Sequence, residues 1–161
     1  FTTRNVLLSI GRRGSPRKLN IPGETMEKVA YRLLEPEEIL DKNIVVVGGG
    51  DSAVESALLL ADNNRVTLSY RKDVFQRIKP KNNERINEAI SRGIIDVRFN
   101  SNLEAIEKDE VIIAEGDGRE KVRLKNDLVY ILAGGEMPTQ FLEKIGIKIT
   151  KKFGDAVLKH Q

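Results

Sequence analysis

The sequence of 161 residues contains no cysteine and a single histidine, and these two shortages narrow the possible chemistry. Without cysteine, the chain itself cannot form a disulfide, a thiolate metal site, an iron–sulfur site or a thiol nucleophile. The one histidine, His160, lies beside the C-terminus, where a side chain is far more often solvated than catalytic. We find no paired carboxylates, no Ser–His–Asp set and no metal-ligand spacing, and therefore expect neither catalytic residues nor a metal site.

Tryptophan is also absent, aromatic residues make up only 5% of the chain, and no apolar run approaches the roughly 20 residues that a membrane helix needs. The net charge of +3 and the pI near 9.1 indicate a mildly basic protein whose charges of both signs are mixed along the chain. A nucleic-acid or acidic-protein binder is therefore a weak alternative, and we expect no nucleic-acid and no membrane partner. No signal peptide is visible, and a cytoplasmic location is expected.

The periodicity of apolar residues predicts a strand–turn–helix–strand unit in the middle of the chain. Residues 44–47 form an unbroken β-branched run, which is typical of a central parallel strand. Small and apolar residues within 52–61 fall on one face of a helix, and residues 65–70 form the next strand candidate. This order indicates a βαβ unit.

The rest of the chain adds further elements to this unit. We expect a helix over residues 82–92, ended by Gly93, and a strand over 94–99. Residues 103–124 resemble an antiparallel meander with a hairpin turn at Asp117-Gly118, and strands are expected over 128–132 and 5–10. A short helix over 139–145 and a linker with short helical turns over 12–42 complete the prediction. The expected fold class is α/β, a three-layer Rossmann-like domain with a parallel sheet and an antiparallel β-meander.

The turn after the first central strand has the form G-x-G-x-x-A, and each small residue suits a nucleotide site. Gly48 permits a tight turn, Gly50 lets a diphosphate approach the backbone, and Ala53 lets helix and strand pack closely. The free N–H groups of the following helix favour the diphosphate charge. Asp51 or Ser52 is expected to cap this helix. The predicted cofactor-binding residues of the turn are Gly48, Gly49, Gly50, Asp51, Ser52 and Ala53.

The end of the second strand predicts which dinucleotide binds. An NAD site usually has a carboxylate there, about 20 residues beyond the glycines, to hold the ribose hydroxyls. This chain has Tyr70-Arg71-Lys72 instead, with Arg77 nearby. Two cations suit the 2′-phosphate of NADPH, and Tyr70 could lie against the adenine. NADH is accordingly the less favoured ligand, and the simpler alternative is that Arg71 and Lys72 are a solvated surface pair.

Small residues also end the last predicted strand, at Ala133, Gly134 and Gly135. Ligands of open parallel sheets sit at the carboxyl edge of the strands. The nicotinamide half of the cofactor could therefore pass close to this backbone. A simple strand-ending turn is an equal alternative.

The runs Val-Val-Val-Gly-Gly-Gly-Asp-Ser-Ala-Val-Glu-Ser-Ala (45–57) and Val-Thr-Leu-Ser-Tyr-Arg-Lys-Asp-Val-Phe (66–75) closely resemble the pyridine-nucleotide-binding domain of thioredoxin reductase-like flavoproteins. In that family a His-Arg-Arg segment grips the NADPH phosphate, and Tyr70, Arg71 and Lys72 occupy those positions here. The resemblance covers about residues 5–150. It implies that residues 6–11 close a preceding FAD domain and that residues 128–136 precede the return to it.

The smaller thioredoxin reductases carry a Cys-x-x-Cys pair in this domain, whereas this chain has none. It therefore resembles the relatives that lack the dithiol, such as ferredoxin–NADP reductase-type or bacillithiol-disulfide-reductase-like proteins. The FAD-binding glycine motif is also missing. The resemblance thus implies the central domain of a longer flavoprotein, with an FAD-domain strand and linker over residues 1–42, the NAD(P)H-binding domain over 43–136 and a return segment over 137–161.

The function expected from these features is to bind NADPH and to position the nicotinamide for hydride transfer to FAD held on another domain. The isolated chain is expected to be inactive, and a homodimer is possible because relatives are often dimers. A stand-alone NAD(P)H-sensing module without redox chemistry is the alternative function. The basic cluster of Arg12, Arg13, Arg17 and Lys18 is interpreted as solvated, with contact to the FAD domain as the alternative.

Overall fold

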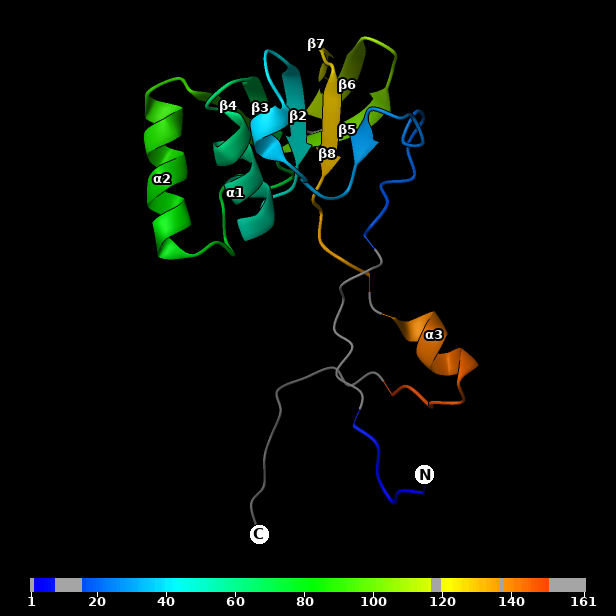
Figure 1. Ribbon diagram of the computed structural model, residues 1–161. Coiled ribbons are helices and arrows are strands. Elements are labelled where there is room, and N and C mark those ends of the chain that lie inside the picture. The colour runs from blue at the N-terminus through cyan, green and yellow to red at the C-terminus, as the bar shows by residue number, and fades with distance from the viewer. Residues whose placement is uncertain (1, 8–15, 117–119, 137, 151–161) are drawn as a thin grey trace.

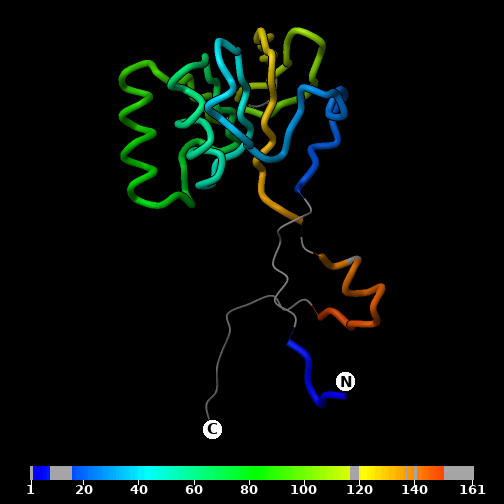
Figure 2. The backbone as a smooth tube through the Cα atoms, viewed as in Figure 1, coloured from blue at the N-terminus to red at the C-terminus, as the bar shows by residue number. Residues whose placement is uncertain are grey.

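The computed structural model describes residues 2–7, 16–116, 120–136 and 138–150 (Figures 1 and 2). Three layers make up the main body: two helices, a parallel sheet and an antiparallel sheet. The parallel sheet has five strands in the order β1-β8-β2-β3-β4. Their bounds are β1 (Val29–Ala30), β8 (Leu128–Ile131), β2 (Asn43–Val47), β3 (Arg65–Ser69) and β4 (Ile95–Arg98). The expected α/β three-layer fold is confirmed.

The central strand β2 is buried on both faces, as its β-branched run predicts. Ile44 and Val46 pack in the core beneath the helices, whereas Val45 and Val47 pack in a second core beneath the antiparallel sheet. Successive side chains of a strand point to opposite faces, so a strand between two layers must be apolar at every position. This requirement explains why residues 44–47 show no alternation with polar residues.

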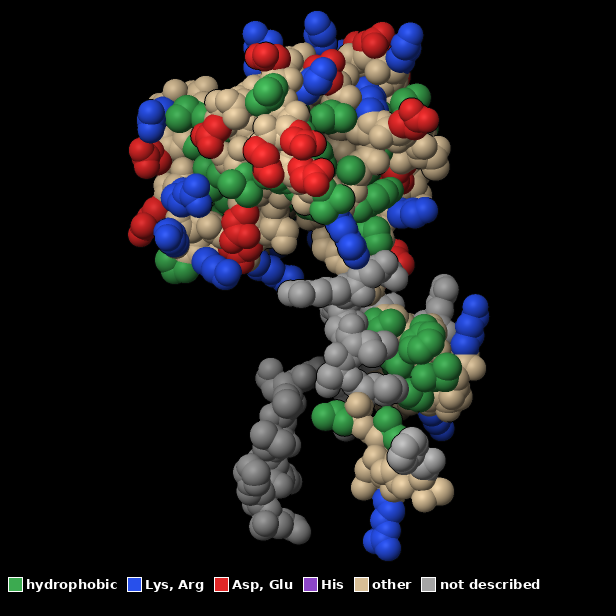
Figure 3. All heavy atoms as spheres, in the orientation of Figure 1, with side chains coloured by type: hydrophobic (Ala, Val, Ile, Leu, Met, Phe, Trp, Pro, Cys, Tyr) green, Lys and Arg blue, Asp and Glu red, His purple; other side chains and the backbone are tan. Residues whose placement is uncertain are grey.

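The helical layer consists of α1 (Asp51–Leu60) and α2 (Pro80–Ser91). Figure 1 shows both helices on the same side of the parallel sheet. Gly93, with φ +66°, follows α2 and ends it as expected. The short helices are η1 (Pro36–Glu38) and α3 (Thr139–Lys144), and α3 stands apart from the three layers in Figure 1. Hydrophobic side chains gather on α3 in Figure 3.

The opposite layer is the meander of β5 (Ser101–Ile106), β6 (Glu110–Glu115) and β7 (Glu120–Lys125). Its strands pair antiparallel in chain order, which confirms the predicted meander. Leu103, Val111 and Ile113 are buried between this sheet and β2. The predicted turn at Asp117-Gly118 lies outside the described residues, although β6 and β7 on either side of it pair in register.

Two expectations for the N-terminal part differ from the structure. The predicted linker over 12–42 contributes the edge strand β1, whose Val29 and Ala30 pair with β8. A two-residue strand has too short a pattern to be seen in a sequence, and it forms only because β8 offers a free edge. Residues 5–7 of the predicted strand over 5–10 are not in a strand, and residues 8–10 lie outside the described part. Val6 and Leu7 are exposed. Within the described ranges, no helix is both long enough and apolar enough to cross a membrane.

The segment before β1 is organised around the buried carboxylate of Glu24. The backbone N–H groups of Leu19 (2.8 Å) and Asn20 (2.6 Å) donate to it, and so does the Tyr31 hydroxyl (2.8 Å). Burial favours a higher pKa for Glu24, but these hydrogen bonds together outweigh burial and lower the pKa below its ordinary value. Glu24 therefore fixes the path of residues 19–21 along the domain.

The tightest packing in the fold lies where β2 ends. A Cβ on Gly48 would fall 2.5 Å from the carbonyl oxygen of Leu132 and 2.8 Å from the Cβ of Ala53. Gly48 also has φ +150°, a conformation that side-chain-bearing residues rarely adopt. The end of β8, the end of β2 and the start of α1 can meet only because this residue is glycine.

We expect Gly48→Ala to destabilise the protein by about 2–4 kcal/mol, because overpacking and an unfavourable φ add together. The matched control is Gly50→Ala, since a Cβ at Gly50 meets no atom within 4 Å. Chemical denaturation of both variants measures the difference in free energy of unfolding. Equal stabilities for Gly48→Ala and Gly50→Ala would contradict the packing argument.

The Glu24–Tyr31 pair should make stability depend on pH at both extremes. The lowered pKa of Glu24 means that its contribution is complete above the ordinary pKa of 4.5 and is lost as the pH falls further. Burial and the Glu24 carboxylate raise the pKa of Tyr31 from 10.0 to about 12, so its contribution is complete below pH 10 and is lost as the pH rises towards 12.

Tyr31→Phe should lower the free energy of unfolding near neutral pH by about 1–3 kcal/mol, because it removes a hydrogen bond to a charged group. Its difference from the unmodified protein should shrink as Tyr31 ionises between pH 10 and pH 12. Denaturant unfolding at several pH values gives this difference directly. A difference that stays constant over that interval would show that Tyr31 does not titrate as described.

Candidate functional site

A pocket of about 540 Å³ opens at the carboxyl edge of the parallel sheet. The ends of β2, β3 and β8 meet there because parallel strands point the same way. The start of β5 and the segment before Glu24 complete the wall. The lining residues are Arg17, Leu19, Val47, Gly48, Gly49, Gly50, Asp51, Ser52, Ser69, Tyr70, Arg71, Lys72, Arg77, Ser101, Asn102, Leu103, Leu132, Ala133 and Gly134.

The structure places the predicted glycine turn on the floor of this pocket. Gly50 faces open space, as a backbone approached by a ligand must. It is also the N-cap of α1, with extended backbone angles and no side-chain cap, so the expectation that Asp51 or Ser52 caps the helix was wrong. The first N–H groups of a helix have no intrahelical acceptor, and those of α1 begin directly beside Gly50. Ala53 is fully buried against Gly48 and does not line the pocket.

Gly49 is glycine for a reason that the sequence did not show. A Cβ there would fall 2.0 Å from a ring carbon of Tyr70, so the phenol ring lies directly against the turn. Tyr70 stacks on Phe75, with ring centroids 5.4 Å apart, and Phe75 meets Phe99 edge-on at 5.1 Å. This aromatic row holds the end of β3 next to the turn.

Asp51, the first residue of α1, braces the loop that follows β3. Its carboxylate accepts hydrogen bonds from the Lys79 backbone N–H (2.8 Å) and the Asn82 side-chain amide (2.7 Å). These two bonds, with Lys79 the larger influence, lower the pKa of Asp51. Asn82 also donates to Glu55 at 2.8 Å, which ties α2 to α1. Asp51 thus fixes the loop that follows β3, and its charge is already engaged within the protein.

Cations dominate the charge around the pocket. Among the described residues that line it, Arg17, Arg71, Lys72 and Arg77 stand against the single carboxylate of Asp51. The side chain of Arg71 is exposed, and the Lys72 ammonium donates to the Gln76 amide oxygen. A parallel bridge between Gly50 and Arg77 draws the loop back over the glycine turn. The three cations predicted for this site therefore lie together on its wall.

The last predicted group lies at the far side of the pocket, after β8. Ala133 and Gly134 line the wall, whereas Gly135 does not. Gly134 has φ +89°, and its carbonyl accepts a hydrogen bond from the Arg17 N–H at 2.9 Å. Pro16 and Gly135 form an antiparallel bridge beside it. The segment 16–17 thus pairs with the end of β8.

Sequence reasoning missed several residues of the wall. Arg17 was interpreted as part of a solvated cluster, yet it lines the pocket with Leu19. Ser69 and Ser101 are buried beneath it and share a hydrogen bond of 2.8 Å, in which Ser69 donates because Ser101 donates to Arg98. The polar residue that ends the buried strand β3 was a usable signal for Ser69. Nothing local in the sequence pointed to Arg17 or Leu19.

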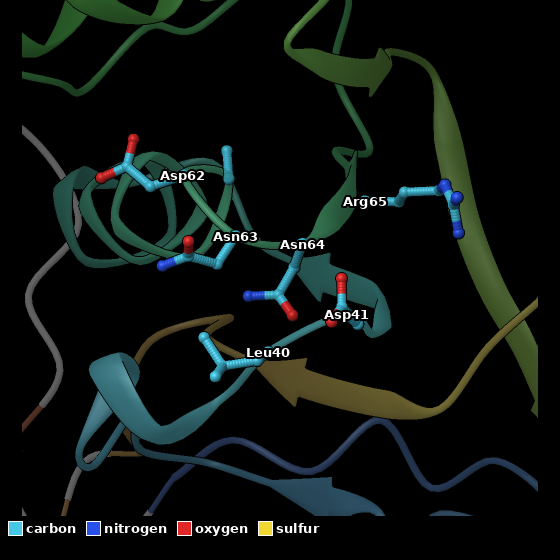
Figure 4. Close-up of a pocket in the computed structure, with 7 residues that line it drawn as sticks. Leu40, Asp41, Asp62, Asn63, Asn64 and Arg65 are labelled. Atoms are coloured by element: carbon cyan, nitrogen blue, oxygen red, sulfur yellow. The ribbon is translucent and has the colours of Figure 1, made fainter.

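A second hollow, of about 530 Å³, lies at the amino edge of the sheet beside Asp41 and Asn63 (Figure 4). The Asn64 side chain there donates to the carbonyls of Ile39 (2.7 Å) and Leu60 (2.9 Å) and accepts from the Lys42 N–H (3.0 Å). These bonds tie the end of α1 to the start of β2. Ligands of open parallel sheets bind at the carboxyl edge, so the pocket there, and not this hollow, is the candidate site.

The whole chain is similar to known proteins. Residues 1–161 match the family model described as pyridine nucleotide-disulphide oxidoreductase. Bacilliredoxin reductase Bdr of Bacillus subtilis is 34% identical over 156 residues, which cover 96% of this chain and 48% of that protein. A ferredoxin–NADP reductase of Ignicoccus hospitalis is 33% identical over 153 residues, or 91% of this chain and 48% of that protein. The chain therefore spans about half the length of these relatives.

Solved structures agree with the sequence matches. The bacillithiol disulfide reductase Bdr of Bacillus cereus has a TM-score of 0.80 and 31% identity, over 86% of this chain and 43% of that one. A thioredoxin reductase of Lactococcus lactis has a TM-score of 0.69 and 27% identity, over 81% of this chain and 45% of that one. The resemblance inferred from the glycine turn is confirmed, and the chain belongs to the pyridine nucleotide-disulphide oxidoreductase family.

Proposed function

We propose that this chain binds NADPH in the pocket at the carboxyl edge of its parallel sheet. The observation that carries the proposal is the combination of an open glycine turn at the start of a helix with three cations from the neighbouring loop. Gly50 leaves room for a diphosphate, and α1 offers it free N–H groups. Arg71, Lys72 and Arg77 line the same pocket.

The positive charge has a specific use at the end of β3. NADPH differs from NADH by a 2′-phosphate, which carries charge that Arg71 and Lys72 can neutralise. The Asp51 brace and the Gly50–Arg77 bridge hold this loop in place before any ligand arrives. Binding then requires little ordering of the loop, which favours affinity. The Tyr70 ring at the same end is engaged by Phe75 and Gly49, so its expected contact with the adenine is not part of this proposal.

The family description names a pyridine nucleotide, and the resemblance to thioredoxin reductase-like flavoproteins adds FAD to the wider role that we propose. The nicotinamide half would lie towards Ala133 and Gly134, at the far end of the pocket. There this chain would position it for hydride transfer to FAD held on another part of a longer protein. We propose that residues 43–136 form the body of the nucleotide-binding domain, that residues 137–161 are a return segment, and that residues 1–42, which include β1, lead into the domain from an FAD domain. A nucleotide-sensing module is less well supported, because the family match covers residues 1–161.

Replacing Arg71 and Lys72 together by alanine should weaken NADPH binding about thirtyfold, or about 2 kcal/mol, because charge-assisted contacts to the 2′-phosphate are lost. NADH binding should change by less than about threefold, since it lacks this phosphate. Isothermal titration calorimetry at moderate salt, with both nucleotides and both proteins, measures the four affinities. An equal loss for NADPH and NADH would refute a clamp on the 2′-phosphate.

Gly50→Ala should abolish most binding of both nucleotides while leaving the fold intact, because its methyl group would enter the space proposed for the diphosphate. We expect a loss of about tenfold or more in affinity, again by calorimetry. Thermal unfolding of the same sample serves as the control for folding. Undiminished binding by a folded Gly50→Ala protein would place the diphosphate elsewhere.

A further inference from the structure

Arg17 lies at the end of the pocket that the 2′-phosphate clamp does not use. It lines the cavity together with Ala133 and Gly134, across the end of β2 from Arg71 and Lys72. A 2′-phosphate held near β3 leaves no partner of its own for a cation beside β8. The 2′-phosphate therefore does not account for the position of Arg17.

The backbone of Arg17 is anchored from both sides. Its N–H donates to the Gly134 carbonyl at 2.9 Å, and Pro16 beside it bridges to Gly135. Two residues further on, the Leu19 N–H is held by the buried Glu24 carboxylate at 2.8 Å. These are main-chain contacts, so they do not depend on the Arg17 side chain. The fold thus fixes the backbone of an exposed arginine on the wall, next to the turn that ends β8.

The ligand part expected at this point changes its charge during the reaction. The nicotinamide ring carries one positive charge when it is oxidised and none when it is reduced. A cation beside the ring repels the oxidised form and has no charge to repel in the ring of the reduced form. The diphosphate and the 2′-phosphate are common to both forms, so their attraction to Arg17 cancels when the two affinities are compared.

We propose that Arg17 is a specificity-determining residue that favours reduced over oxidised nucleotide. This inference rests on the proposed function, because it places the nicotinamide beside β8. Its consequence is directional: Arg17 helps the pocket to take up NADPH and to release NADP⁺ after the hydride has left. The other cations among the described lining residues lie elsewhere in the pocket: Arg71 and Lys72 follow β3, and Arg77 is bridged to Gly50 at the glycine turn.

The test is the ratio of the dissociation constants of NADP⁺ and NADPH, measured by calorimetry at low salt. Arg17→Gln should lower this ratio about threefold, as expected for unit charges separated by a solvated pocket. Arg17→Lys should restore it, because the charge returns. Raising the salt concentration should shrink the difference between the unmodified protein and the Arg17→Gln variant, since ions screen exposed charges.

Lys18→Gln is the matched control. It removes the same charge from the adjacent exposed residue, which does not line the pocket, and should leave the ratio unchanged. Arg71→Gln should weaken both forms alike. If the unmodified protein binds NADPH but Arg17→Gln leaves the ratio within error, this inference fails and the proposed function stands. If the unmodified protein binds neither form, the proposed function fails and the inference with it.

Discussion

The close approach of three backbones at Gly48 is the constraint on which the rest of the site depends. Leu132 and Ala53 crowd the position that a side chain would need, so β8, β2 and α1 meet there without any intervening atom. This contact places the start of α1 at the carboxyl edge of the sheet and leaves Gly50 open above it. The pocket is thus a consequence of packing in the core, and its floor exists before any ligand binds.

Short polar contacts then bring separate segments of the chain to this floor. Asp51 and the Gly50–Arg77 bridge hold the loop after β3 on one side, and the pairing of Arg17 with Gly134 holds the N-terminal segment on the other. Both sides contribute cations, which are costly to crowd together without an anionic partner. In the proposed function, the phosphates of the dinucleotide would partner the cations that follow β3 and the glycine turn, whereas Arg17 would face the nicotinamide end.

Much of this arrangement could be predicted from the sequence, because its signals are local. The β-branched run before Gly48 and the small residues after it specify a buried strand, a turn and a helix within a few positions. The missed features depend on contacts between distant residues. Strand β1 exists only beside β8, Arg17 reaches the pocket only through Gly134, and Gly49 is required only because the Tyr70 ring lies on it. The spacing of residues along the sequence does not predict such contacts.

The central claim, that the carboxyl-edge pocket is the nucleotide site, is tested most directly by NMR. The protein has a mass of 18.1 kDa, which suits backbone amide spectra of a ¹⁵N-labelled sample titrated with NADPH. The account predicts that the largest shifts fall on the glycine turn around Gly50, on Tyr70 to Lys72 and on Gly134. Shifts centred instead on Asp41 and Asn64, at the amino edge of the sheet, would contradict it.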